Sequence, residues 1–284
     1  MDDTIMRPVS PARPPAAYIG GKKQLAARLV AMIEGVEHHT YAEPFVGMGG
    51  VFLRRRLAPK AEVINDISAD VATLFRILQR HYVPLMDLLR FQFTSRREFE
   101  RLLATDPVTL TDLERAVRFL YLQRVAFGGK VAGRNFGVSP GMPGRFDVTK
   151  LATTLVDLNE RLSGVIIENL PFQQFIERYD GEGVLFYLDP PYAGGETDYG
   201  LGVFSPESFV KLAEQLGKIK GAFILSINDT PSIRDIFAAF KCEAVSLTYT
   251  IGSGAATEAK ELIVTPPSMV VKAPAPGLFD ALLP

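Results

Sequence analysis

Short apolar runs that alternate with amphipathic helical patterns are the feature that most restricts the fold of this chain. The apolar runs lie at residues 61–65, 164–168, 184–188, 222–226 and 261–265. Strands that are apolar throughout are buried on both faces of a sheet, so helices must cover both sides. This pattern predicts an α/β fold built on a doubly wound, mostly parallel sheet.

One long helical stretch interrupts the alternation. Amphipathic patterns cover residues 71–82, 96–103 and 111–125, and a glycine-rich segment without strand patterns follows at 127–145. We therefore predict a helical domain inserted into a core domain. The expected boundaries are a proline-rich, flexible or extended tail at 1–17, a core at 18–68 and 160–266, an inserted helical domain at 69–159, and a second proline-rich tail at 267–284.

Composition excludes several classes of protein. Of the 284 residues, 47% are hydrophobic and 22% are charged, which is the balance of a soluble globular protein. The single cysteine, Cys242, and three histidines are too few for a disulfide or for most metal sites, so we expect no metal. No apolar run reaches the roughly 20 residues of a membrane span, and the acidic start of the chain is unlike a secretory signal. We expect a reducing, cytoplasmic location.

Charge is distributed unevenly along the chain. The net charge is −1, which gives no hint of a nucleic-acid partner. Residues 124–150, however, hold five basic residues and a single acidic one, Asp147. A basic loop on a neutral body is typical of an element that contacts phosphates, and a solvated surface loop is an equally good interpretation.

A glycine turn follows the first predicted strand. The segment 41–50 contains Glu43 and ends in Gly47-Met48-Gly49-Gly50, after which the sequence predicts a helix over residues 51–57. Such a turn lets the backbone approach a nucleotide or a dinucleotide, or serves only as a tight connection. Glu43 would repel a pyrophosphate but could hold the ammonium group of an amino-acid moiety.

Two further polar positions flank this turn. Asp66 follows the second predicted strand, where an acidic side chain can accept hydrogen bonds from both ribose hydroxyls. Alternatively, Asp66 or Ser68 caps the next helix. Tyr18 and Lys22 lie in a glycine-containing turn before a predicted helix at 24–33, which is either part of a site or a plain helix entry.

The sharpest signal is Asp189-Pro190-Pro191-Tyr192, directly after the apolar run 184–188. Two prolines stiffen the chain and remove two backbone donors, so a carboxylate and free carbonyls are held at a strand end. Asp189 and the Pro190 carbonyl could accept both N–H bonds of an exocyclic amine, and Tyr192 offers a stacking face to a planar base. Attack of that amine on an electrophilic methyl is the predicted chemistry. A rigid strand exit without function remains the alternative.

These motifs, in this order, resemble the DNA adenine-N6 methyltransferases of the Dam type, the alpha-order D12 class, which use S-adenosylmethionine. The resemblance runs from about Tyr18 to Thr265. It implies a Rossmann-like methyltransferase core and a site-specific enzyme that flips an adenine out of double-stranded DNA. It also implies that the inserted domain at 69–159 recognises the target sequence.

The resemblance assigns roles residue by residue. The implied cofactor-binding residues are Tyr18, Gly21, Lys22, Glu43, Pro44, Phe45, Gly47, Gly49, Asp66, Phe172 and Asp189. The implied catalytic residues are Asp189, Pro190, Pro191 and Tyr192. The implied DNA-binding residues are Arg124, Lys130, Arg134 and Asn135. One position departs from the family, because the usual Asp-Phe is replaced by Asn169-Leu170-Pro171-Phe172. Phe172 is still expected to pack on the cofactor adenine. Asn169 is expected to replace the family's Asp as the contact to that adenine.

Three alternatives stay open. Cytosine-N4 methylation uses a chemically similar amine, whereas cytosine-C5 chemistry needs a cysteine nucleophile that Cys242 is badly placed to supply. A relative that binds DNA without transferring methyl groups is the second alternative. A nicotinamide oxidoreductase is the third, and it leaves Asp189-Pro190-Pro191-Tyr192 unexplained.

Three other features receive weaker interpretations. Residues 54–56 are three arginines that we interpret as a solvated face. Phe204 either closes the base pocket or packs in the core. The apolar tail segment 277–283 either docks on a clamp-like partner or packs onto the body.

Overall fold

The computed structural model describes residues 6–18, 20, 22, 24–138, 141–195, 204–249 and 257–271. The side chains of 247–249 and 257–259 are not described. Gly21, expected to bind the cofactor, and the apolar tail segment 277–283 both lie outside the described residues. No helix among the described residues is long and apolar enough to cross a membrane.

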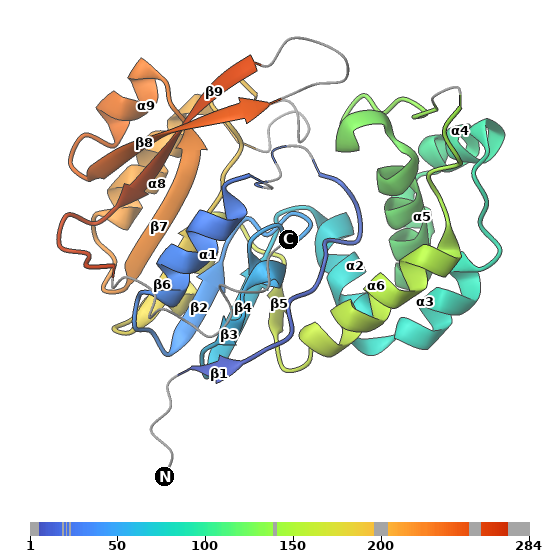
Figure 1. Cartoon of the computed structure of the whole chain (residues 1–284), viewed down its shortest axis with the longest axis horizontal. Coiled ribbons are helices and arrows are strands. Elements are labelled where there is room, and N and C mark those ends of the chain that lie inside the picture. Colours follow the sequence, from blue (N-terminus) through green and yellow to red (C-terminus); the bar gives the residue numbers. More distant parts are fainter. Residues whose placement is uncertain are drawn as a thin grey trace.

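A seven-stranded sheet forms the centre of the molecule (Figure 1). Its strand order is β5-β4-β2-β6-β7-β9-β8, and the five strands from β5 to β7 are parallel while β9 runs antiparallel between β7 and β8. This confirms the predicted α/β class with a mostly parallel sheet. The strands are β2 (Thr40–Glu43), β4 (Ala61–Asn65), β5 (Ile166–Glu168), β6 (Val184–Leu188), β7 (Ala222–Asn228), β8 (Lys241–Tyr249) and β9 (Thr257–Thr265).

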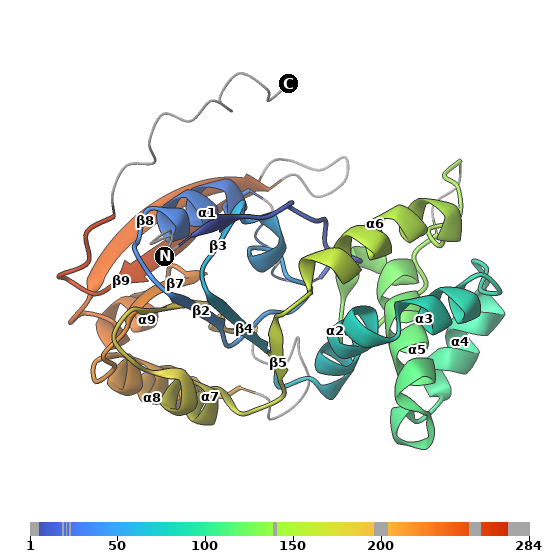
Figure 2. The same cartoon turned by 90° about the horizontal axis from the view of Figure 1, so that it is seen from below.

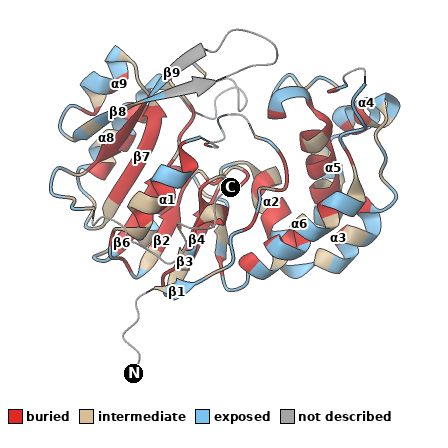
Figure 3. Ribbon diagram, in the orientation of Figure 1, coloured by how far each residue is buried: buried red, intermediate tan, exposed pale blue. Residues whose placement is uncertain are grey.

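Side chains of the central strands are buried on both sheet faces. In β6, Leu185 and Tyr187 join a core cluster that includes α1 (Ala26–Glu34), whereas Phe186 and Leu188 join a second cluster. That second cluster includes α7 (Phe172–Tyr179), α8 (Pro206–Leu216) and α9 (Pro231–Ile236). Alternate residues of a strand point to opposite faces, so a strand between two helical layers must be apolar throughout. Figures 2 and 3 show these layers and the buried strands between them.

The remaining helices pack together beside β5, at one edge of the sheet (Figure 1). They are α2 (Ala69–Arg80), α3 (Tyr82–Leu89), α4 (Arg96–Ala104), α5 (Asp112–Val125) and α6 (Val148–Arg161), with short 3₁₀ turns η2 (Pro107–Thr109) and η3 (Phe127–Gly129). We call this group the helical lobe. It occupies the stretch that the sequence predicts to be an inserted domain, although its last helix ends two residues beyond the expected boundary at 159.

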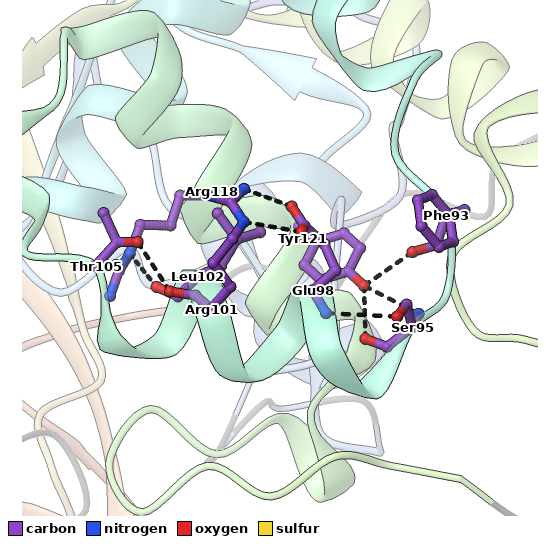
Figure 4. Close-up of polar contacts among 8 residues, drawn as sticks. All are labelled: Phe93, Ser95, Glu98, Arg101, Leu102, Thr105, Arg118 and Tyr121. Carbon is purple, nitrogen blue, oxygen red and sulfur yellow. Dashed lines mark hydrogen bonds and ion pairs between the residues drawn. The ribbon is translucent and has the colours of Figure 1, made fainter.

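Helix α5 is the buried centre of the helical lobe, and Figure 4 shows polar contacts between α5 and α4. A capping box formed by Thr111 and Glu114 starts it. The Tyr121 hydroxyl donates to the Phe93 carbonyl at 2.9 Å, and the buried Arg118 Nε donates to the Leu102 carbonyl at the end of α4 at 2.7 Å. Polar side chains thus tie α4 to α5 in addition to apolar packing.

Two expectations near the start of the chain are wrong. The helix predicted over residues 51–57 is a single 3₁₀ turn, η1 (Phe52–Arg54), because Arg55 is extended and residues 57–58 form strand β3 (Leu57–Ala58). The described part of the predicted tail at 1–17 is not free: β1 (Arg7–Pro8) pairs with β3, and the Ala12 N–H donates to the Leu53 carbonyl. At the other end, Met269 and Val271 pack against the core.

Of the three arginines at 54–56, Arg56 is exposed as we expected, but Arg54 and Arg55 are not. Arg55 is fully buried and pairs with Glu62 of β4. Arg161, at the end of α6, donates to both Glu62 oxygens at 2.7 and 2.8 Å. This buried Arg55–Glu62–Arg161 triad joins the helical lobe to the sheet, and Arg54 instead lines the main cavity.

Candidate active site

A cavity of about 960 Å³ lies where the strand order reverses, between β2 and its neighbours β4 and β6. In an open parallel sheet the carboxyl ends of the strands form a crevice at this reversal, where ligands bind. Three acidic side chains reach the cavity from three strand ends: Glu43 from β2, Asp66 from β4 and Asp189 from β6. The sequence placed all three at strand ends, and the fold brings them to one edge.

The glycine turn forms one wall of this cavity and is tied to Asp66. The Gly47 N–H donates to Asp66 Oδ2 at 2.9 Å, and the Ser68 N–H donates to Asp66 Oδ1 at 2.8 Å. Asp66 therefore links the glycine turn to the start of α2. Burial raises the pKa of Asp66 to about 6. Gly49 has φ +74°, and a Cβ there would lie 2.7 Å from the Leu53 side chain, so this turn requires glycine.

Glu43 is buried without a cation. Its side chain accepts one hydrogen bond, from the Tyr41 hydroxyl at 2.6 Å, and among the described residues it forms no ion pair. Burial raises its pKa to about 8, against the opposing effect of the Tyr41 hydrogen bond. A buried carboxyl in this state is suited to receive a cationic group of a ligand.

Aromatic rings line the side of the cavity near α7. Phe172 contacts Phe45 and Phe204, with ring centroids 5.6 and 5.7 Å apart. Phe204 is 5% exposed and also packs on Phe209, so it both lines the cavity and belongs to the core. Asn169 does not line the cavity. Its side-chain Nδ2 donates to the Asp66 and Ile67 carbonyls, so it supports the loop after β4.

Asp189 lies in a buried polar cluster that also contains Lys22, Tyr192 and Glu261. Lys22 Nζ is 2.7 Å from Asp189 Oδ1, and it also donates to the Tyr192 hydroxyl at 2.7 Å. The Tyr192 hydroxyl in turn donates to Glu261 Oε1 of β9 at 2.5 Å. Burial raises the pKa of Asp189 to about 6, although the Lys22 ammonium lowers it. The side chain of Asp189 keeps 21% of its surface exposed, so it can meet a substrate.

Two further hydroxyl groups, which are hydrogen-bonded to each other, also support Asp189. Ser226 Oγ donates to Asp189 Oδ1 at 3.4 Å and lies 2.9 Å from the Tyr187 hydroxyl. Asp189 Oδ1 already contacts the Lys22 ammonium and accepts a hydrogen bond from Ser226. The second carboxylate oxygen, Oδ2, is therefore the one available to a substrate N–H group.

The expected DNA-binding residues have different surroundings. Lys130 and Asn135 are exposed on the basic, glycine-containing loop. Arg124 donates to the Pro15 carbonyl at 3.1 Å and lines the cavity. Arg134 donates to Gln123 Oε1 and to the Lys130 carbonyl, both at 3.1 Å, so its guanidinium holds the loop in shape.

The N-terminal segment connects this loop to the cavity. Gln123 Nε2 donates to the Ala17 carbonyl at 2.8 Å. Gly129 lies so close to the same segment that a Cβ on it would be 2.8 Å from the Ala17 backbone. Residues 13, 14 and 16–18 line the cavity on their way to Lys22.

Three side chains that contact the predicted site residues were not among them: Tyr41, Ser226 and Glu261. Tyr41 lies two residues before Glu43 in a strand, so the period of two could have revealed it. Glu261 begins an apolar run, and a carboxylate in a buried strand is itself a signal. Of the predicted site residues, Pro44, Phe45, Gly47, Lys22 and Pro191 line the cavity, whereas Gly49, Pro190 and Tyr192 do not. No group of three metal-ligating side chains occurs in the described part of the chain.

The fold and site together define a Rossmann-like enzyme with its ligand cavity at the reversal of strand order. The family described as D12 class N6 adenine-specific DNA methyltransferase matches residues 18–251, and the chain belongs to this family.

Curated relatives extend over most of the chain. The type II methyltransferase M1.LlaDCHI of Lactococcus lactis subsp. cremoris is 28% identical over 89% of this chain and 95% of its own length. The type II methyltransferase M.CviBI of Paramecium bursaria Chlorella virus NC1A is 24% identical over 79% and 86%. The DNA N-6-adenine-methyltransferase of Escherichia phage P1 is 28% identical over 83% of this chain and 33% of its own length.

Proposed function

We propose that this protein transfers the methyl group of S-adenosylmethionine to N6 of an adenine flipped out of double-stranded DNA. The single observation that carries the proposal is the placement of Asp189, at the end of β6, where it borders the same cavity as Glu43 and Asp66. Family membership supports the same reaction. Asp189 Oδ2, which accepts no hydrogen bond from the residues that the structure describes, supports a role on the target amine.

The cavity fits S-adenosylmethionine in each of its parts. Glu43 would hold the ammonium group of the methionine portion, because its buried carboxyl forms no ion pair with any of the described residues. Asp66 would accept hydrogen bonds from the ribose hydroxyls, since each of its oxygens can accept more than the one backbone N–H that it now receives. Phe172 would pack against the adenine ring.

The chain's own residues act on the target amine. Asp189 Oδ2 and the Pro190 carbonyl would accept its two N–H groups, which draws the nitrogen lone pair away from the ring. When bound, S-adenosylmethionine supplies a methyl group whose bond to sulfur breaks, with both electrons left on sulfur, as nitrogen forms its bond to carbon. The nitrogen then carries positive charge, which the ionised Asp189 would stabilise, and it releases one proton to solvent water.

The helical lobe and its basic loop would contact the DNA. Lys130 and Asn135 are exposed on this loop, Arg134 donates to its Lys130 carbonyl, and Arg124 donates to the adjacent N-terminal segment at Pro15. We propose that the lobe recognises the target sequence. The N-terminal segment contacts both the loop and the cavity, and we propose that it fixes their relative position.

Cofactor binding is expected to release a proton from Glu43. Below pH 8 this carboxyl is neutral, because burial raises its pKa to about 8, whereas an ammonium ligand requires it to be ionised. The observed affinity should therefore rise about tenfold per pH unit between about pH 6.5 and 7.5 and level off above pH 8. Calorimetric titration in two buffers of different ionisation enthalpy measures the proton directly. Glu43→Gln should abolish the pH slope, and a slope that persists in that variant contradicts the assignment.

Lys130 is expected to contribute one phosphate contact. Lys130→Ala should weaken DNA binding and lower the slope of log affinity against log salt by about 1. Lys218→Ala is the matched control, because Lys218 is also exposed but follows the C-terminal end of α8, which lies away from the helical lobe (Figure 1). Fluorescence anisotropy with a labelled duplex at several salt concentrations measures both slopes. Equal slopes for the two variants would place the DNA elsewhere.

Sequencing that detects modified bases tests the proposed function as a whole. Unmethylated plasmid DNA is incubated with the purified protein and S-adenosylmethionine. We expect N6-methyladenine at one short sequence motif, because the helical lobe offers a defined surface for reading bases. DNA that stays unmodified, although the protein binds the cofactor, would contradict the proposal.

A further inference from the structure

Glu261 is a buried carboxylate with no role in the proposed reaction described above. It lies on β9, opposite Asn228 of β7, and is 1% exposed. Burying a charge is costly unless partners compensate for it. Its partners are the Tyr192 hydroxyl, which donates to Oε1 at 2.5 Å, and Lys22, whose Nζ lies 3.7 Å from Oε2. Both partners belong to the active site.

The first consequence concerns the direction of the Tyr192 ring. Its hydroxyl accepts a hydrogen bond from Lys22 at 2.7 Å and donates one to Glu261. A hydroxyl held between one donor and one acceptor fixes the ring that carries it. Lys22 Nζ also lies 4.2 Å from the ring centroid. The face that Tyr192 presents to a base therefore depends on Glu261.

The second consequence concerns charge. One ammonium, Lys22, lies between two carboxylates, 2.7 Å from Asp189 and 3.7 Å from Glu261. The three groups sum to −1 when all are ionised, so Lys22 does not fully neutralise Asp189. Negative charge at this point favours an amine that becomes positive during transfer. The other titratable groups facing Asp189 are Tyr187 and Glu43, among the described residues.

We propose that Glu261 is a positioning residue for the methyl transfer. From β9 it fixes the Tyr192 hydroxyl and shares Lys22 with Asp189, so that the stacking ring and the catalytic carboxylate meet the target base together. This inference rests on the proposed function, because it assigns Tyr192 and Asp189 to the target base.

Glu261→Gln tests the proposal, because glutamine keeps a hydrogen-bond acceptor for Tyr192 and removes the charge. We expect kcat to fall about 10- to 100-fold, with the KM for S-adenosylmethionine within about threefold of the wild type. Glu261 raises the pKa of Asp189, so its removal should move the acid limb of the kcat profile to lower pH. Glu243→Gln on the adjacent strand β8 is the matched control and should change neither quantity.

A second variant separates positioning from a general loss of stability. Tyr192→Phe keeps the ring but removes the hydroxyl that Glu261 holds. It should lower kcat with little change in the cofactor KM. The double variant with Glu261→Ala, which removes the acceptor for the Tyr192 hydroxyl, should lose much less than the product of the two single losses, because both changes break the same contact. If Glu261→Gln does not fold, the Tyr192→Phe measurement alone decides, and an unchanged kcat overturns the proposal.

The outcomes distinguish this inference from the proposed function. Wild-type protein that methylates adenine while Glu261→Gln retains wild-type kcat and pH profile overturns the role of Glu261 and leaves the function intact. Independent, multiplicative losses in the double variant also overturn it. Wild-type protein that methylates no adenine refutes the proposed function itself.

Discussion

Asp189→Asn should abolish nearly all methyl transfer while leaving cofactor binding almost unchanged. The substitution keeps the shape of the side chain but replaces an acceptor oxygen by an amide NH₂ and removes the negative charge. The amine then loses one acceptor and the charge that stabilises it as it becomes positive. We expect a loss of about 10²- to 10⁴-fold in the rate of transfer, the range seen when a positioned acid–base or electrostatic group is removed.

Single-turnover kinetics with preformed enzyme–DNA complex measures this loss, and calorimetry measures cofactor affinity in parallel. The affinity should stay within about threefold of the wild type, because Glu43 and Asp66 would supply the contacts to the cofactor. Asp189→Ala should lose at least as much activity as the asparagine variant. A transfer rate in Asp189→Asn above one tenth of the wild-type rate contradicts the role given to this carboxylate.

Glu62→Ala should have the largest effect on stability. Glu62 lies buried between Arg55 and Arg161, and its removal leaves two buried guanidinium groups without a counter-charge. Breaking a buried pair in this way costs about 3–5 kcal/mol. Glu243→Gln is the control: its pair with Arg28 is about half exposed, and exposed pairs contribute about 0–1 kcal/mol.

Urea unfolding at several pH values measures both variants. Burial by itself would raise the pKa of Glu62, but hydrogen bonds from Arg161 and the charge of Arg55 outweigh it and lower the pKa. A carboxyl with a lowered folded-state pKa stabilises the fold above its unfolded value and loses that effect as pH falls. The difference between wild type and Glu62→Ala should therefore shrink below its ordinary pKa of 4.5. A cost near that of the Glu243 control at pH 7 would contradict this role.

The sequence predicts the sheet and the position of its acidic residues well, for a physical reason. Buried parallel strands are apolar on both faces, and the residues that follow them must lie at one edge of the sheet. The runs at 61–65 and 184–188 therefore match β4 and β6 residue for residue. Glu43, Asp66 and Asp189 follow from the same rule.

What the sequence does not predict are contacts between distant segments. The arginines at 54–56 look solvated because nothing local reveals that Glu62 and Arg161 meet Arg55 in the interior. The same limit applies to Glu261, which meets Tyr192 only because β9 inserts between β7 and β8. Asn169 could be taken for a ligand contact because its two carbonyl partners lie more than 100 residues away.

The most direct test of the account is mass spectrometry of nucleosides from DNA treated with the protein and isotopically labelled S-adenosylmethionine. Wild-type protein should yield labelled N6-methyladenine, and Asp189→Asn should yield almost none. Labelled N4-methylcytosine would show that the site accepts a different exocyclic amine, and the absence of any labelled base with wild-type protein would contradict the account at its centre.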